Sequence, residues 1–235
     1  MIYLNKNMTR ASAIFAKQIS NKLTLPISLF SVDEIYNLVN QECLILIDKQ
    51  NLENQHLNNL FNDIKVSNHA IPCKILLIGY ANSLEIKNII SIPDSDFVCF
   101  DELYNHHENK QTNTIFIELS NTSKEQVDKL NNILYPNNKK FAVKAVNNTD
   151  FAHVQNLGLS TENDTLKLLS ECLYYVNVHD FYLYDAIYAN KKIINIDDIP
   201  KIKNIDDIDS IVIDNSIYSN IVSDKPISKI LNKIL

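Results

Sequence analysis

Three residues that can bind or activate a hydroxyl, Asn177, His179 and Asp180, follow a hydrophobic run in the second half of the chain. A carboxylate suits diol recognition because it can accept hydrogen bonds from two hydroxyls, and a histidine can orient a substrate or act as a base. Asp185 follows at the predicted start of a helix, where its charge also favours the helix dipole. The sequence supports a site in this loop better than it supports any one reaction.

This loop belongs to a longer stretch, 154–195, whose hydrophobic pattern predicts strand, helix, strand, helix and strand. Such a unit builds a parallel sheet and brings its polar loops to one edge. In the first half, the continuous apolar run 43–47 predicts a strand covered on both faces, and it ends at Asp48. By position Asp48 is a candidate base, and it could equally cap the helix that follows.

The first half alternates predicted strands and helices throughout. Apolar runs predict strands at 2–4, 27–30, 43–47, 75–78 and 97–100. Between them, apolar residues at helical spacing predict helices, one capped by Thr9 and another containing Leu84, Ile86 and Ile89. A doubly wound parallel sheet is the simplest architecture for this pattern.

The second half repeats the alternation after a polar stretch, 101–114, which is typical of a linker. Beyond 154–195, it contains predicted strands at 115–119, 141–146 and 211–213, a helix capped by Ser123 and a closing helix at 227–235. We therefore predict an α/β protein with two Rossmann-like doubly wound domains, 1–105 and 112–235.

Composition excludes several classes of function. A chain with 46% hydrophobic and 21% charged residues, without a run of about 20 apolar residues or the apolar core of a signal peptide, is expected to be soluble and cytoplasmic. The net charge of -6 argues against binding to a nucleic-acid backbone. The scattered cysteines, each within or beside an apolar run, predict buried thiols rather than zinc ligands or disulfides. They are Cys43, Cys73, Cys99 and Cys172.

Two segments resemble the C-terminal domain of GT-B fold glycosyltransferases. HVQNLGLSTENDTLKLLSECLYYVNV is similar to the family's run of a short strand ending in Leu-Gly, here at Gly158, a helix and an apolar strand. DAIYANKKIIN is similar to the family segment Glu-Ala-hydrophobic-Ala-x-Gly-Lys-Pro-hydrophobic-Ile. Asp185 stands in the place of its glutamate, and Lys191 begins the matching tail. Two consecutive Rossmann-like halves also match the family's architecture, so the resemblance implies a GT-B-like fold.

The resemblance implies transfer of a sugar from a nucleotide-sugar donor to an acceptor hydroxyl, without a metal or a resident cofactor. The donor would lie at the carboxyl ends of the strands in the C-terminal domain. Its candidate contacts are Asp185, Asp180, Asn177, Lys124, Lys191 and Gly158. Lys124 enters because it lies beside the predicted N-cap Ser123, where helix-start amides favour an anion.

His179 and Asp48 are the candidate catalytic residues, and Lys6 and Arg10 are the candidate acceptor contacts in the turn after the first strand. The acceptor is left open as a glycan or another precursor of a surface polymer. The sequence departs from the family at Asn177, which lies eight residues before Asp185, where the family has a second acidic residue.

Two alternatives stay open. A noncatalytic GT-B-like binding or assembly protein would explain both Asn177 and the scarcity of glycine, of which the chain has 2. A metal-dependent transferase would instead use Asp94-Ser-Asp96 or Asp207-Ile-Asp209, a spacing that can hold a divalent ion on a diphosphate.

Overall fold

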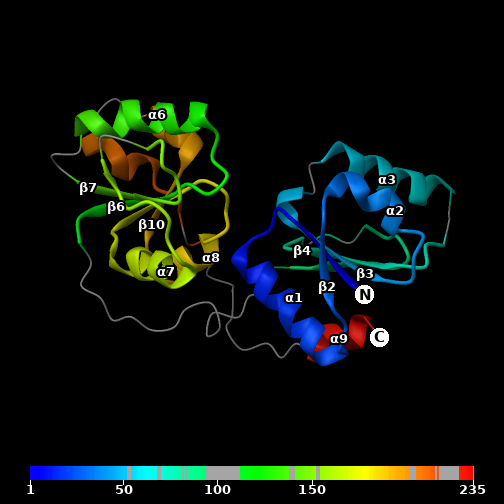
Figure 1. Cartoon of the computed structure of the whole chain (residues 1–235). Helices are drawn as coiled ribbons and strands as arrows, with labels where there is room; N and C mark the ends of the chain where they lie inside the picture. Colours follow the sequence, from blue (N-terminus) through cyan, green and yellow to red (C-terminus); the bar gives the residue numbers. More distant parts are fainter. Residues whose placement is uncertain are drawn as a thin grey trace. The chain divides into compact units, whose positions relative to one another are not determined.

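The computed structural model describes residues 1–51, 54–67, 70–80, 82, 84–93, 112–137, 141–151, 154–201, 205–214, 216 and 228–234. The chain forms two compact units, Met1–Leu103 with Asn220–Leu235, and Tyr104–Ser219 (Figure 1). Each unit contains a five-stranded sheet in which every pairing between neighbouring strands is parallel. The predicted α/β class with two Rossmann-like sheets is thereby confirmed.

In the first unit the strand order is β2-β1-β3-β4-β5. The strands are β1 (Ile2–Asn5), β2 (Ile27–Phe30), β3 (Leu44–Asp48), β4 (Lys74–Ile78) and β5 (Ile89–Ile92). The helices and 3₁₀ turns are α1 (Arg10–Leu23), η1 (Val32–Glu34), α2 (Ile35–Leu38), η2 (Lys49–Asn51) and α3 (Gln55–Ser67).

Strand β3 is buried on both faces, as its continuous apolar sequence predicts. Ile45 and Ile47 join the core cluster formed with α2 and α3. Leu44 and Leu46 are equally buried and alternate to the other face, on which α1 lies (Figure 1). The sheet is therefore sandwiched between two layers of helix.

The segment after β4 differs from the prediction. Ile89 was expected in a helix with Leu84 and Ile86, but it begins β5, and residues 84–88 form no helix. The isoleucines of β5 are β-branched and pair in register with β4, which favours a strand. The strand predicted at 97–100 lies outside the described residues.

The first unit is discontinuous in sequence, because the chain returns to it through α9 (Ser228–Ile234). Ile230 and Ile234 of this helix are buried, and Lys74 at the start of β4 donates a hydrogen bond to the carbonyl of Ile234. The closing helix was predicted, but within a second domain of 112–235. The second unit ends earlier, at Ser219.

In the second unit the strand order is β10-β9-β6-β7-β8. The strands are β6 (Thr114–Glu118), β7 (Ala142–Val146), β8 (Gln155–Asn156), β9 (Tyr174–Asn177) and β10 (Lys192–Asn195). The helices and 3₁₀ turns are α6 (Lys124–Leu134), η3 (Tyr135–Asn137), α7 (Glu162–Glu171), α8 (Leu183–Tyr188), η4 (Ile196–Lys201) and η5 (Ile205–Ile211).

Two core clusters cover the two faces of this sheet. Ile115 and Ile117 of β6 pack in the cluster that includes α6 and the 3₁₀ turns η4 and η5. Phe116, between them in sequence, packs in the cluster that includes α7 and α8. The strand predicted at 211–213 is reduced to one antiparallel bridge, between Ile194 and Val212.

The strand orders identify where each sheet changes its direction of growth. In the first unit this switch point lies between β1 and β3, and in the second between β6 and β9. Ligands of doubly wound sheets bind outside the carboxyl ends of the strands at such a point. Each unit therefore has one position at which a ligand site is expected.

Within the described ranges, no helix combines the length and the apolar character needed to span a membrane.

Candidate functional site

Asp48 ends β3 at the switch point of the first unit, where its side chain is 1% exposed. Its Oδ2 accepts hydrogen bonds from the backbone N–H and the hydroxyl of Thr9, at 3.0 and 3.1 Å, and from the hydroxyl of Ser12. Its Oδ1 accepts one from the N–H of Gln50, at 3.1 Å. Because Thr9 is the N-cap of α1, this carboxylate occupies the place where the helix start would receive an anion.

This geometry suits a structural carboxylate better than the predicted base. Four hydrogen bonds engage its oxygens, and burial keeps a substrate hydroxyl away from them. The capping role weighed for Asp48 is present, but three of the four bonds come from the start of α1, which precedes Asp48 in sequence. Sequence reasoning considered only the following helix.

Three asparagines, Asn5, Asn7 and Asn51, form further hydrogen bonds at the same switch point. The amide oxygen of Asn5 accepts a hydrogen bond from the Asp48 N–H at 2.7 Å, and its Nδ2 donates to the carbonyl of Asn7. Asn51 donates to that carbonyl as well, at 2.6 Å. Lys6 is exposed in this turn and Arg10 is half-buried at the start of α1. Their predicted contact with an acceptor stays a prediction.

Glu118 ends β6 at the switch point of the second unit, and sequence reasoning missed it. Its side chain is 4% exposed, and its Oε1 accepts hydrogen bonds from the N–H of Ser120 at 2.8 Å and from the Ser120 hydroxyl. Nδ2 of Asn147, which follows β7, donates to the same oxygen at 3.0 Å. The signal was present, since Glu118 ends a buried strand just as Asp48 does.

Asn147 extends this network to the loop that contains Gly158. Its amide oxygen accepts a hydrogen bond from the N–H of Ser160 at 2.8 Å, and its own N–H donates to the Gly158 carbonyl at 2.7 Å. Gly158 has φ +71°, and a Cβ built there would meet no heavy atom within 4 Å. Gly158 thus lies just after the carboxyl end of β8, the side of the sheet on which the donor is predicted, and the space beside it is open.

Asn177 and Asp180 form a closed turn after β9. The Asp180 N–H donates to the Asn177 amide oxygen at 3.0 Å, and Nδ2 of Asn177 donates to Asp180 Oδ1 and to the amide oxygen of Asn195 at 3.3 Å. Asp180 has φ 54°, a left-handed conformation that aspartate tolerates better than most residues. Asn177 is buried and orients the partly exposed Asp180.

His179 connects the two loops at the switch point. Its Nε2 lies 3.1 Å from the hydroxyl of Thr122, in the loop between β6 and α6. Both side chains are partly exposed. The structure therefore brings His179 and Asp180 next to the loop that follows Glu118, which the spacing of these residues in sequence does not reveal.

Asp185 lies in the first turn of α8 and is 0% exposed. Burial raises the pKa of Tyr175 well above its ordinary value, and the charges of Glu118, Asp185 and Asp180 raise it further. Burial and the nearby Glu118 likewise raise the pKa of Tyr182. Four carboxylates, Glu118, Asp180, Asp185 and Glu162, thus act on one or both of these buried tyrosines. Asp185 is fully buried, and its predicted contact with the donor stays a prediction.

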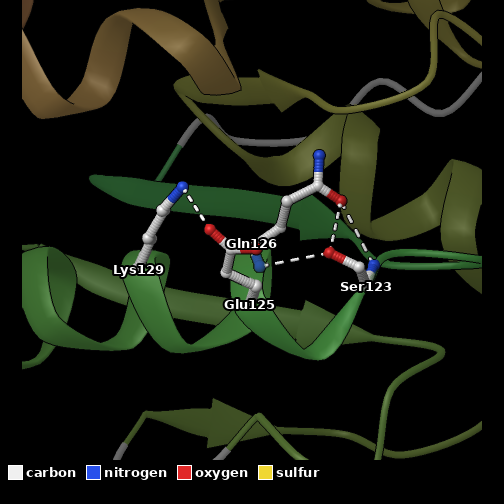
Figure 2. A network of polar contacts seen from close by, with 4 residues as sticks. All are labelled: Ser123, Glu125, Gln126 and Lys129. Atoms are coloured by element: carbon white, nitrogen blue, oxygen red, sulfur yellow. Dashed lines mark hydrogen bonds and ion pairs between the residues drawn. The ribbon is translucent and has the colours of Figure 1, made fainter.

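Helix α6 begins directly after the loop that contains Thr122, and its start carries a capping box (Figure 2). The Ser123 hydroxyl accepts a hydrogen bond from the Gln126 N–H at 3.3 Å, and Gln126 Oε1 accepts one from the Ser123 N–H at 3.1 Å. Glu125 pairs with Lys129 at 2.9 Å, which lowers the pKa of Glu125. The exposed Lys124 is the first helical residue, where backbone amides have no intrahelical partner.

Lys191 lies at the amino end of a strand, whereas His179 and Asp180 follow the carboxyl end of β9, at the opposite edge of the sheet. Lys191 directly precedes β10, whose first residue, Lys192, pairs with the first residue of β9. Its side chain is 3% exposed, and its Nζ donates to the Ser170 carbonyl at 2.6 Å. Burial lowers its pKa. The structure therefore does not bring Lys191 together with Asp180 and His179.

The second Asp-x-Asp triplet, Asp207-Ile-Asp209, also lies near the amino ends of β9 and β10. Asp209 accepts hydrogen bonds from Lys192 at 2.8 Å and from the Tyr174 hydroxyl at 3.0 Å, and these partners lower its pKa. Among the described residues, no group of three or more His, Cys, Asp or Glu is arranged to hold a metal. The first triplet, Asp94-Ser-Asp96, lies outside the described residues.

Comparison of the chain with protein-family models and with curated proteins finds no match.

Proposed function

We propose that the second unit binds a nucleotide-sugar donor and that the protein is a metal-independent glycosyltransferase of the GT-B type. One observation carries the proposal. Asp180, His179, Glu118 and Asn147 gather at the carboxyl ends of three parallel strands, around the switch point of a Rossmann-like sheet. The resemblance of 153–195 to the C-terminal domain of these enzymes supports the same conclusion.

The two parts of a donor would meet different surfaces of this site. Asp180 is partly exposed and can accept hydrogen bonds from the hydroxyls of a ribose or a sugar. The diphosphate would lie at the start of α6, where backbone amides and Lys124 favour negative charge. The carboxylates thus lie on the hydroxyl side and the lysine on the phosphate side.

His179 is the catalytic residue of the proposal. Its imidazole takes the proton of the acceptor hydroxyl as that oxygen attacks the anomeric carbon. The bond from the anomeric carbon to the diphosphate breaks, and the leaving group keeps the electron pair. Lys124 and the α6 amides stabilise the charge that develops on the diphosphate.

Binding tests the proposal first. We expect calorimetric titration with a panel of nucleotide sugars and nucleoside diphosphates to identify a ligand. We expect Asp180→Asn to weaken its binding about tenfold, which is about 1.4 kcal/mol. Asparagine tolerates the left-handed backbone, so the loop is kept. The matched control is Asp207→Asn, which changes an exposed aspartate on η5. This variant should bind the ligand as tightly as wild type does. The proposal fails if no member of the panel binds.

Turnover tests the catalytic part. We expect His179→Gln to keep donor affinity and to slow donor hydrolysis or transfer about 100-fold, the usual loss for a general base. Full activity in this variant would remove His179 from the mechanism. Adding a chelator should leave activity unchanged, and inhibition would favour the metal-dependent alternative.

A noncatalytic binding protein is the second candidate, and the position of Asp48 favours it. The hydrogen bonds that close Asp48 inside the first unit leave only one of the two predicted catalytic residues, His179, in an accessible position. Tight donor binding without any hydrolysis or transfer would support this candidate over the enzyme.

A further inference from the structure

Glu118 has one carboxylate oxygen engaged and one that is not. The three hydrogen bonds that described residues donate to its side chain fall on Oε1, from the N–H and hydroxyl of Ser120 and from Asn147. Oε2 accepts none from the described residues. The side chain is 4% exposed, and the part that stays accessible includes Oε2. Oε2 is therefore a carboxylate oxygen that can accept a hydrogen bond from a ligand.

The engaged oxygen keeps the carboxylate in place. Ser120 belongs to the loop that reaches Thr122 and His179, and Asn147 holds the loop of Gly158 and Ser160. Hydrogen bonds thus connect the four loops after β6, β7, β8 and β9, directly or indirectly, to Oε1. A carboxylate fixed in this way presents Oε2 in a defined position, at the end of the strand that borders the switch point.

The surrounding charge decides which kind of ligand atom Oε2 accepts. Burial is the largest cause that raises the pKa of Tyr175, and the carboxylates of Glu118, Asp185 and Asp180 raise it further, so three acidic side chains lie near its hydroxyl. A phosphate oxygen would be repelled and has no proton to donate at neutral pH. A sugar or ribose hydroxyl is neutral and donates a hydrogen bond.

We propose that Glu118 is a ligand-binding residue of the second unit and that its Oε2 accepts a hydrogen bond from a hydroxyl of the donor. This inference rests on the proposed function and adds a contact that the sequence did not suggest. The hydroxyl belongs either to the ribose of the nucleotide or to the transferred sugar, and the experiment separates these two sources.

The test combines a substitution with ligands that lack single hydroxyls. The probes are the tightest-binding nucleoside diphosphate of UDP, GDP and CDP, its 2′-deoxy and 3′-deoxy analogues, and the corresponding nucleotide sugar. For wild type, removing the contacted hydroxyl should weaken binding about tenfold, or about 1.4 kcal/mol. For Glu118→Gln the intact ligand should bind about tenfold more weakly, and the loss caused by removing that hydroxyl should shrink to less than threefold. If the hydroxyl belongs to the ribose, one of the deoxynucleotides binds more weakly than the intact nucleotide. If it belongs to the transferred sugar, Glu118→Gln weakens binding of the nucleotide sugar more than binding of the nucleoside diphosphate.

Two further variants keep the result interpretable. Glu171→Gln is the matched control, because Glu171 ends α7 at the opposite edge of the sheet, and it should discriminate among the ligands as wild type does. Glu118→Asp retains the charge but withdraws the carboxylate, so it should also lose the discrimination, which covers the case that Glu118→Gln does not fold. If a folded Glu118 variant discriminates as wild type does, the inference is wrong. If wild type binds none of the probes, the proposed function itself fails.

Discussion

Asp48 and Thr9 lie 39 residues apart in sequence, and the Asp48 carboxylate accepts hydrogen bonds from both the backbone N–H and the hydroxyl of Thr9, at 3.0 and 3.1 Å. The end of β3 is thereby joined to the start of α1. A side chain of the protein fills the anion position of the first unit's switch point, whereas in the second unit a local capping box holds the N–H groups of Ser123 and Gln126 at the start of α6. The two units therefore differ at the place where ligands bind to such sheets.

Replacing Asp48 should destabilise the first unit strongly. Asp48→Ala leaves the buried donors of Thr9 and Ser12 and the partly buried N–H of Gln50 without this acceptor, so we expect a loss of about 3 kcal/mol in the free energy of unfolding. Urea denaturation followed by circular dichroism measures the loss, and hydrogen exchange of the α1 amides assigns it to this unit. The control Asp33→Ala removes an exposed carboxylate and should change little. A loss below about 1 kcal/mol for Asp48→Ala would contradict the structural role.

The capping box of α6 gives a smaller, local effect (Figure 2). Ser123→Ala removes the acceptor for the Gln126 N–H, and we expect it to lower the free energy of unfolding by about 1 kcal/mol. Glu125→Ala breaks the neighbouring exposed ion pair with Lys129 and should cost less. Urea unfolding of both variants measures the difference. Equal losses would mean that the cap does not stabilise the helix more than the surface pair.

Lys191 should make stability depend on pH. Burial lowers its pKa in the folded protein below the ordinary value of 10.5. Between the folded and unfolded pKa values the unfolded chain binds more protons, so the stability contributed by this residue rises with pH up to about the unfolded value and then levels off. Lys191→Met lacks this rise. Its stability relative to wild type should therefore be highest near neutral pH and should fall as the pH approaches 10.5.

Urea unfolding of wild type and Lys191→Met from pH 7 to 10.5 tests this expectation. The other titrating groups are shared by both proteins, so the difference between the two curves isolates Lys191. Parallel curves would show that its pKa is not lowered. Donor affinity should be unchanged in Lys191→Met, because the side chain lies at the opposite edge of the sheet from the proposed site.

Gly158→Ala tests backbone conformation alone. A Cβ at this position meets no atom within 4 Å, so the expected loss of about 1 kcal/mol comes only from φ +71°. Gly158→Asn should cost less, since asparagine adopts this conformation more readily. Thermal unfolding distinguishes the two variants. A much larger loss for alanine would indicate a steric contact instead.

Much of the fold follows from hydrophobic periodicity. Continuous apolar runs such as 43–47 mark buried parallel strands, and both five-stranded sheets are built largely from strands predicted in this way. The pattern failed at Ile89, because spacings of two and three residues fit a helix and a strand about equally well in so short a segment. The return of α9 to the first unit was missed because periodicity marks a helix without indicating which sheet it packs against.

The site was predicted less completely, and the reason is the distance between its parts along the chain. His179 and Asp180 stood out because they follow a strand together, but their neighbour Glu118 lies far upstream. The role of Asp48 depended on Thr9 and Ser12, which sequence alone does not place beside it. The position of Lys191 was open to prediction, because a residue that precedes a parallel strand lies at the edge away from the ligand.

The discontinuity of the first unit also affects how the chain is made. Residues 228–234 leave the ribosome after the whole of the second unit, although α9 and Lys74 belong to one core. Domains generally fold as units, in the order in which they become available. The first unit can therefore complete its core only after every residue of the second unit has been made. A ribosome stalled shortly after residue 219 would carry a second unit with all of its residues and a first unit without α9.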